Sequence, residues 1–261
     1  MTAQSLQTVL DHYFAGDWRA HRALVTGDLI QDDTAEAYDR FRDLLLQLKL
    51  RVHCVPGNHD VPELMKAVCS RPPFSYCARE EIGDWLLVGI DSFVGGTAGG
   101  AVSQAELERL SAVVGASDAQ HVMVFVHHPP VPMGSEWLDT VGLDNGEAFV
   151  EHLHSLGRVR VLAFGHVHQD YDEDHGGLRI LATPSTCRQF RPGSKKFAVD
   201  DTPPAYRRSD LRPGGPGGAE GRGGGEGGSQ RAPFGGARGA RPRGRTGAGR
   251  PCPGGAPRVR A

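Results

Sequence analysis

Four short polar motifs, each following an apolar run, constrain this chain more than any other feature of its sequence. The apolar runs have the length of buried strands, so each motif falls where a strand ends. In α/β folds the loops after strands converge at one edge of the sheet, where ligand sites collect. The motifs are Gly27-Asp28, Gly57-Asn58-His59-Asp60, His127-His128-Pro129 and Gly165-His166-Val167-His168.

Apolar runs alternate with amphipathic segments, which predicts an α/β fold with a substantial sheet. Residues 34–50 have apolar side chains at helical spacing, and Ser103 with Glu106 forms a capping-box pattern before a second helix. A third helix is expected over 147–156. The predicted strands are 23–25, 51–55, 85–90, 121–126, 159–164, 178–182 and 196–199.

The residue types in the four motifs are metal ligands. Carboxylate, amide oxygen and imidazole suit Mn²⁺, iron or Zn²⁺, and the five cysteines contain no CxxC pair that would favour a thiolate site. The two oxygens of Asp28 can bridge two cations, and cations about 3.5–4 Å apart are a common arrangement for phosphoryl transfer. Alternation in an extended segment would send both imidazoles of Gly165-His166-Val167-His168 to the same side.

Each motif alone has a plain structural interpretation, because a Gly-Asp pair after a strand is usually a turn and a lone histidine usually lies on the surface. The occurrence of all four motifs in one chain favours a metal site. The glycines before Asp28, Asn58 and His166 are expected to let the backbone turn sharply there. Five histidines outside the motifs are interpreted as surface residues: His21, His53, His152, His154 and His175.

The series GD, GNHD, HHPP and GHVH resembles the calcineurin-like metallophosphoesterase family over about residues 5–206. Three further segments are similar to its bacterial class III cyclic-AMP phosphodiesterase branch: TGDLIQD at 26–32, WLDTVGLDNGE at 137–147 and TPSTCRQFRP at 183–192. The resemblance implies a four-layer αββα sandwich with two divalent metal ions at the sheet edges. Manganese or iron is expected, with zinc as the alternative.

The resemblance also implies roles for single residues. Asp28 would bridge both metals, and His168 would belong to the first. His59 would be a general acid that protonates the leaving alkoxide or orients the phosphate. Its alternatives are a third ligand or a structural hydrogen bond to Asp60. The second metal would be completed by Asn58, His127 and His166.

The implied function is metal-dependent hydrolysis of a phosphodiester, 3′,5′-cyclic AMP to 5′-AMP, by a hydroxide that two metals activate. The nearest alternative is a broad-specificity phosphodiesterase or nucleotidase. A different alternative is a non-catalytic remnant that binds one metal. A third is an RNA-binding protein that works through an Arg/Gly tail. A nucleic-acid partner is therefore expected only if the tail binds nucleic acid.

The family's first motif, Asp-x-His after the first strand, has no counterpart before Asp28. We therefore expect residue 1 to fall inside the domain, after its first strand, and the sandwich to lack that strand. The first metal would keep only Asp28 and His168 from this chain. We expect the chain as it stands to be inactive or nearly so.

Residues 211–261 have ten arginines and two acidic residues, a net charge of +8, so the remaining residues carry −10 for the chain to total −2. We divide the chain into a phosphoesterase domain over 1–207, incomplete at both ends, and a Gly/Arg/Pro-rich tail over 208–261. The tail is interpreted as disordered. Arg-Gly segments can bind nucleic acid, but we favour out-of-frame translation of GC-rich DNA as its origin.

No apolar run is long enough to span a membrane, and the first residues do not resemble a secretory signal. The odd number of cysteines favours a reduced, cytoplasmic setting. The expected partner is a small-molecule nucleotide, and the sequence does not indicate an oligomeric state.

Overall fold

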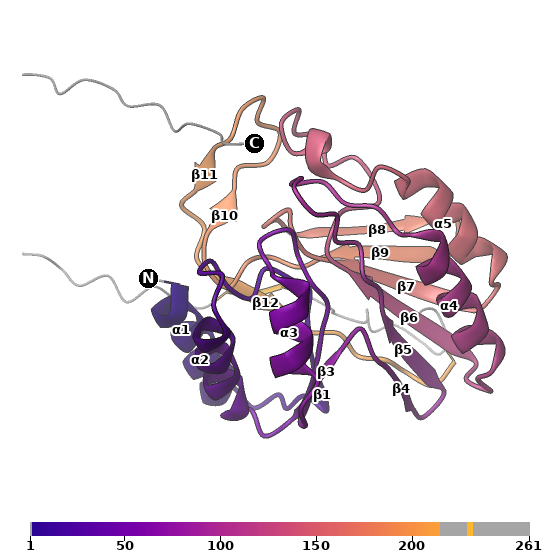
Figure 1. Ribbon diagram of the computed structural model, residues 1–261, viewed down its shortest axis with the longest axis horizontal. Coiled ribbons are helices and arrows are strands. Elements are labelled where there is room, and N and C mark those ends of the chain that lie inside the picture. The colour runs from indigo at the N-terminus through magenta and orange to yellow at the C-terminus, as the bar shows by residue number, and fades with distance from the viewer. Residues whose placement is uncertain (1, 215–228, 232–261) are drawn as a thin grey trace, which may run out of the picture.

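Two β-sheets lie at the centre of the computed structural model, which describes residues 2–214 and 229–231 (Figure 1). The smaller sheet contains the parallel strands β1 (Arg22–Val25), β2 (Arg51–Cys54) and β3 (Phe74–Tyr76). The larger sheet has the order β4-β5-β6-β7-β9-β8. Its strands are β4 (Arg79–Ile82), β5 (Trp85–Gly89), β6 (His121–Val126), β7 (Val159–Phe164), β8 (Tyr171–His175) and β9 (Leu178–Ala182).

The strands that precede the four motifs are parallel neighbours within each sheet. In the larger sheet β5, β6, β7 and β9 are parallel, and β4 and β8 run antiparallel to them at the two edges. The carboxyl ends of β6 and β7 therefore lie side by side, as do those of β1 and β2 in the smaller sheet.

The two sheets pack face to face through the alternate side chains of their strands. Trp85 and Leu87 of β5 point into the layer between the sheets, whereas Leu86 and Val88 point outward. Leu24 of β1 packs against the same inner layer. The buried residues of that layer are Val55, Trp85, Leu87, Met123, Phe125, Val161, Ala163 and Leu181.

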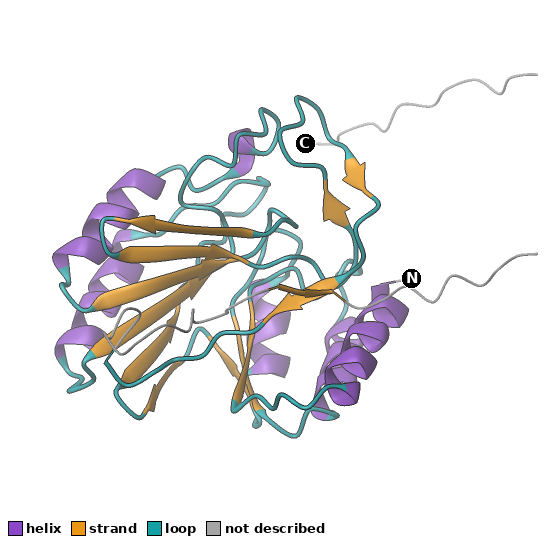
Figure 2. Cartoon of the chain, turned by 180° about the vertical axis from the view of Figure 1, so that it is seen from behind, coloured by secondary structure: helices purple, strands orange, loops and turns teal. Residues whose placement is uncertain are grey.

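Helices cover the outer face of each sheet, so the layers follow the order αββα (Figure 2). Helices α1 (Thr2–Ala15), α2 (Ala35–Leu46) and α3 (Pro62–Cys69) pack on the smaller sheet. Helices α4 (Gln104–Gly115) and α5 (Gly146–Ser155) pack on the larger one, and a short 3₁₀ helix, η1 (Asp139–Val141), precedes α5. The predicted α/β sandwich is confirmed. Among the described helices, none is long and apolar enough to cross a membrane.

The local patterns were partly right about the helices. Ser103 caps α4 by accepting from the Glu106 amide at 3.2 Å. The Glu106 carboxylate does not close the predicted capping box, because it accepts from Asp91 N–H at 3.1 Å and pairs with Arg109. Helix α2 ends at Leu46 rather than at residue 50.

The predicted strand over 196–199 is wrong. Only Val199–Asp200 (β11) is extended and paired, and its partner is β10 (Gln189–Phe190). This two-stranded ribbon depends on a partner that local sequence does not reveal. Strands β3, β4 and β8 and helix α3 were also not predicted, because the strands are short or polar and lack a long apolar run.

An ion network joins the two sheets away from the motifs. Glu80 of β4 accepts hydrogen bonds from Arg22 at 2.6 and 2.7 Å and from Arg51 at 2.8 Å. The Arg22 hydrogen bond, with help from His53, lowers the pKa of Glu80 to about 2. His53 Nε2 lies 2.6 Å from the same carboxylate, and His53 is only 5% exposed. The interpretation of His53 as a surface histidine is therefore wrong.

Part of the predicted tail is described. Strand β12 (Ala205–Arg207) pairs with β13 (Ser229–Arg231). Leu211 packs against the inner layer, and the Trp85 indole N–H donates to the Arg212 carbonyl at 2.9 Å. The rest of the predicted tail lies outside the described residues, so the boundary at residue 207 and the disorder beyond it stay predictions.

Candidate metal centre

The four motifs meet where the carboxyl ends of β1, β2, β6 and β7 converge. Val55 N–H donates to the Val25 carbonyl at 3.1 Å, which joins the first two motif loops. Gly165 N–H donates to the His127 carbonyl at 3.0 Å, which joins the last two. Parallel pairing joins the motifs within each sheet, and contacts between the sheets, such as the His127 Nδ1–H to the Thr26 carbonyl at 2.6 Å, bring together residues about 100 positions apart.

Four donor atoms cluster at this point, with His127 Nε2 in the middle. It lies 3.4 Å from Asp28 Oδ2, 3.2 Å from Asn58 Oδ1 and 3.0 Å from His166 Nδ1. His166 Nδ1 is also 3.0 Å from Asn58 Oδ1. Adjacent ligands of a cation bound at about 2.1 Å are roughly 3.0 Å apart in octahedral and 3.4 Å apart in tetrahedral geometry. The separations among His127 Nε2, His166 Nδ1 and Asn58 Oδ1 fit one divalent cation, and Asp28 Oδ2 approaches this set at His127 Nε2.

Proton counting supports the same conclusion. The His127 Nδ1–H donates to the Thr26 carbonyl at 2.6 Å, so Nε2 of that ring presents a lone pair to the cluster. The Asn58 and Asp28 oxygens are acceptors as well. His166 Nδ1 brings at most one proton to satisfy all of them. Such a set of buried lone pairs is stable around a cation, and its nitrogen and oxygen donors suit manganese, iron or zinc.

Burial lowers the pKa values of His166, His168 and His128, which favours the neutral form that binds metal. It holds the pKa of His166 well below its usual value, with the neighbouring histidines adding to the effect. Burial also lowers the pKa of His168 to about 4, against the opposing charge of Asp28. His128 follows the same pattern, with a pKa of about 3 that burial produces.

The backbone is strained at the predicted ligands. Asp28, His166 and His168 have φ of 56°, 65° and 49°, in the left-handed region that residues with a side chain avoid. Among the described residues only two other non-glycine residues, Lys49 and Cys77, have positive φ. Strain of about 1–3 kcal/mol at each position persists where surrounding structure enforces it, commonly at functional sites.

Two glycines make room for the donors. Gly27 has φ of 93°, so the predicted sharp turn occurs there. Gly57 does not have a positive φ, and its role is space: a Cβ at this position would lie 2.2 Å from Asp28 Oδ1 and 2.7 Å from His127 Cε1. The backbone still turns after Gly57, because the Asp60 N–H donates to the Gly57 carbonyl at 3.1 Å, so the predicted turn occurs there without a positive φ.

Asp60 holds two motif loops together, a role that the sequence analysis did not assign. Its buried carboxylate accepts from the amides of Gly57 at 2.8 Å and Leu29 at 3.2 Å, and from the Tyr38 hydroxyl at 2.9 Å. Burial raises the pKa of Asp60 to about 6. The signal was present, because Asp60 is the fourth residue of Gly57-Asn58-His59-Asp60.

His59 lies beside the donor cluster with its side chain exposed to solvent. Its backbone N–H donates to Asp28 Oδ1 at 3.0 Å, which leaves Asp28 Oδ2 facing the cluster. The role of His59 in proton transfer stays a prediction.

His128 joins the cluster without having been predicted as a ligand. One of its ring nitrogens lies within 4.8 Å of those of His127 and His166. Its Nδ1 is 2.8 Å from Ser92 Oγ, and its buried Nε2 has no hydrogen-bond partner. The second histidine of HHPP was the available signal.

His168, the predicted ligand of the first metal, lies on the side of the cluster toward β10. Its ring stacks on Phe190 at 4.1 Å and 11°, and its carbonyl accepts from the Phe190 amide at 3.2 Å. Asp28 is near enough to raise its pKa. Among the described His, Cys, Asp and Glu side chains, His127, His128 and His166 form the group of three whose donor atoms all lie within 4.8 Å of one another. Asp28 is not a member of that group and approaches it through His127 Nε2 at 3.4 Å.

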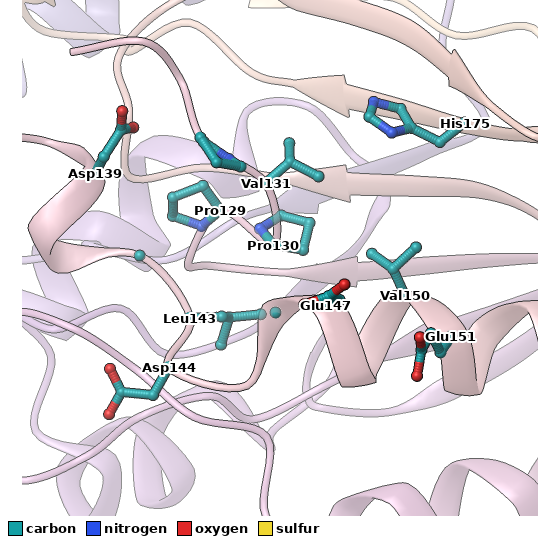
Figure 3. Close-up of a pocket in the computed structure, with 13 residues that line it drawn as sticks. Pro129, Pro130, Val131, Asp139, Leu143, Asp144, Glu147, Val150, Glu151 and His175 are labelled. Carbon is teal, nitrogen blue, oxygen red and sulfur yellow. The ribbon is translucent and has the colours of Figure 1, made fainter. Parts of the chain in front are cut away.

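A separate surface cavity of about 550 Å³ lies behind the HHPP turn (Figure 3). It is framed by Pro129, Pro130, helix α5 and His175. None of the predicted metal ligands lines it. Its charged walls are carboxylates, Asp139, Asp144, Glu147 and Glu151, which would repel an anionic phosphate.

Comparisons of the sequence and of the fold with known proteins identify phosphoesterases. The calcineurin-like phosphoesterase family matches residues 3–170. The chain is 36% identical over 206 residues to the 3′,5′-cyclic adenosine monophosphate phosphodiesterase CpdA of Pseudomonas aeruginosa, covering 79% of this chain and 75% of that protein. It is 34% identical over 211 residues to CpdA of Escherichia coli K12, covering 80% and 77%. A dimetal phosphatase from Danio rerio shares the fold, with a TM-score of 0.57 at 20% identity over 78% of this chain and 82% of that one.

Proposed function

The chain belongs to the calcineurin-like phosphoesterase family, and from that premise we propose that it hydrolyses a phosphodiester, with 3′,5′-cyclic AMP as substrate and 5′-AMP as product. The predicted family and the predicted enzyme class are confirmed by the comparisons. The observation that supports the proposal most strongly is the donor cluster around His127 Nε2, whose spacing suits a divalent cation. We infer the substrate from relatives that are named 3′,5′-cyclic adenosine monophosphate phosphodiesterase and that align over most of the chain.

We assign the second metal to Asp28, Asn58, His127 and His166, and the first to Asp28 and His168. Members of this family use divalent metals, and we favour manganese or iron over zinc because half of the second set is oxygen. When bound, the two ions offset the phosphate charge and supply hydroxide at neutral pH.

The protein's own contribution to bond cleavage is proton transfer by His59. Water adds to phosphorus, the P–O3′ bond breaks, and the 3′ oxygen leaves needing a proton. In this proposal the exposed imidazole of His59 gives that proton. Meanwhile the His59 backbone N–H holds Asp28 Oδ1, so one residue both orients the bridging carboxylate and faces the substrate.

A second candidate function is binding of a single metal without hydrolysis. One observation favours it: the first metal has only Asp28 and His168 assigned to it, whereas His127 and His166, two of the three grouped histidines, are both assigned to the second metal. The stoichiometry of bound metal separates the two, at two ions per chain for the enzyme and one for the remnant. A broad phosphodiesterase or nucleotidase is the alternative within enzymes.

The expected partner is therefore a small nucleotide. Cys54, Cys69, Cys77 and Cys187 are free thiols, which suits the cytoplasmic setting that we propose for this substrate.

The test is an assay of the purified chain with Mn²⁺ against 3′,5′-cyclic AMP, 2′,3′-cyclic AMP, 5′-AMP and bis(p-nitrophenyl) phosphate. If both metal sites are filled, we expect 5′-AMP from the first substrate and no product from the Asn58→Ala variant. Because only Asp28 and His168 are assigned to the first metal, a chain that does not retain that ion should form little or no product. Hydrolysis of 5′-AMP in preference to the cyclic nucleotide would make the protein a nucleotidase. One bound ion and no hydrolysis of any substrate would support the remnant.

A further inference from the structure

An aromatic cluster lies directly beside the metal centre. Trp137, Phe190 and Phe197 have ring centroids 5.2, 5.2 and 5.3 Å apart in edge-to-face contacts. Phe190 in turn stacks on His168 at 4.1 Å. Two ring-to-ring steps therefore join a predicted metal ligand to Phe197 at the outer side of the cluster.

Phe197 is far more exposed than its surroundings require. It is 63% exposed, whereas the next most exposed large apolar residue among those described, Leu46, is 41% exposed. Leaving a phenylalanine ring in water forgoes a favourable burial free energy, so an exposed ring beside a reactive centre suggests contact with a ligand.

The cluster is held in place by hydrogen bonds. Arg191 N–H donates to the Ala198 carbonyl at 2.9 Å, which closes the β10–β11 ribbon around residues 191–198. The Trp137 indole N–H donates to Ser194 Oγ at 3.1 Å, which ties the segment before η1 to that ribbon. Figure 1 shows the ribbon standing clear of both sheets. The exposed ring is thus presented by an ordered element.

The same ribbon carries positive charge. Arg191, Lys195 and Lys196 lie between Phe190 and Phe197 in the sequence, and only Lys195 has a carboxylate partner in the described ion pairs, Glu136 at 3.4 Å. An aromatic surface with cations beside it suits a molecule that combines a flat ring with anionic phosphate.

We propose that Trp137, Phe190 and Phe197 receive the heteroaromatic base of the nucleotide whose phosphate lies at the metal centre. This inference rests on the proposed function and deepens it, since it explains how the site would favour nucleotides over simpler phosphodiesters. Base stacking on an aromatic side chain is tolerant of base identity, so the cluster selects a purine or pyrimidine nucleotide as a class. Phe197 is the contact residue that truncation can test, because its exposure means that the fold does not depend on it.

The experiment compares two ligands that differ only by the base, 5′-AMP and ribose 5-phosphate, on the Mn²⁺-loaded protein. Tryptophan fluorescence and calorimetry measure binding, and the Trp137→Phe variant identifies which of the three tryptophans responds. Phe14→Ala is the matched control, because Phe14 is also an exposed phenylalanine but belongs to helix α1. We expect Phe197→Ala to weaken 5′-AMP by roughly 5- to 100-fold, the range for loss of one stacking partner, with ribose 5-phosphate unchanged.

The outcomes are distinguishable. Equal weakening of both ligands, or none, would overturn the inference while cyclic-nucleotide hydrolysis, measured separately, still supports the function. If neither ligand binds and no cyclic nucleotide is hydrolysed, the proposed function fails and the inference fails with it. Dimerisation that Phe197→Ala abolishes, without any change in 5′-AMP affinity, would assign the exposed ring to a second copy of the chain and refute the base-binding role.

Discussion

Replacing Gly57 by alanine tests whether the donor cluster binds metal, because it adds one methyl group at the point where the loops touch. The new Cβ would lie 2.2 Å from Asp28 Oδ1, 2.5 Å from the Asp28 nitrogen and 2.7 Å from His127 Cε1. Ordinary contacts between such atoms are near 3.5 Å, so the neighbours must move by about 1 Å. Metal ligation tolerates displacements of about 0.2 Å.

Both neighbours of that Cβ belong to predicted ligands, so the displacement falls on the donors themselves. We expect Mn²⁺ affinity to fall by at least about 100-fold, the upper end of the effects seen when supporting residues alone are changed. The free energy of unfolding of the metal-free protein should fall by only about 1–3 kcal/mol, as for other overpacked positions.

Gly115→Ala is the matched control. It makes the same chemical change at the end of α4, where a Cβ would meet nothing within 4 Å and where φ is not positive. Mn²⁺ titration by calorimetry measures affinity, elemental analysis measures occupancy, and near-ultraviolet circular dichroism shows that the variant remains folded. Wild-type affinity in folded Gly57→Ala would refute the assignment of Asp28 and His127 to one ion.

Four further substitutions test the metal ligands, the general acid and the ion network. Asn58→Ala and His166→Ala should each abolish binding at the second metal, and full occupancy by elemental analysis in either variant would contradict the assignment. His59→Ala should reduce kcat by about 10²–10⁴ with metals retained, and far less for a nitrophenolate leaving group that needs no proton; equal losses on both substrates would indicate a structural role. Glu80→Gln should cost about 2 kcal/mol of unfolding free energy at pH 7. Because its folded pKa of about 2 lies below the ordinary 4.5, that advantage should hold above pH 4.5 and shrink as pH falls toward 2, which urea denaturation across this range would measure.

The strand-end motifs could be predicted because each one is a short run of consecutive residues that directly follows an apolar run. The apolar runs before these motifs are strands in the structure, and they precede Asp28, Asn58, His127 and His166. Parallel pairing places the ends of neighbouring strands side by side, which brings the motif loops together within each sheet. Their roles as ligands stay predictions, although the donor spacing suits them.

What could not be predicted depends on partners distant in the sequence. His53 is buried where it contacts Glu80 of the opposite sheet. The residues next to His53 in the sequence do not predict that contact. Strand β4, Arg79-Glu80-Glu81-Ile82, is too polar to be recognised from its own composition, and it exists because β5 pairs with it. The β10–β11 ribbon is likewise defined by pairing between residues nine and eleven positions apart, Phe190 with Val199 and Gln189 with Asp200.

Two residues of the donor cluster come from loops of the smaller sheet and two from loops of the larger sheet. A metal ion bound to all four would therefore link the two halves of the sandwich. An ion bound there would resist their separation in the way a crosslink does, since any unfolding that parts the sheets must release it. The stabilisation grows with the logarithm of free metal, about 1.4 kcal/mol for each tenfold rise above the dissociation constant. The concentration of free metal in the cell would then affect the stability of the folded protein as well as its activity.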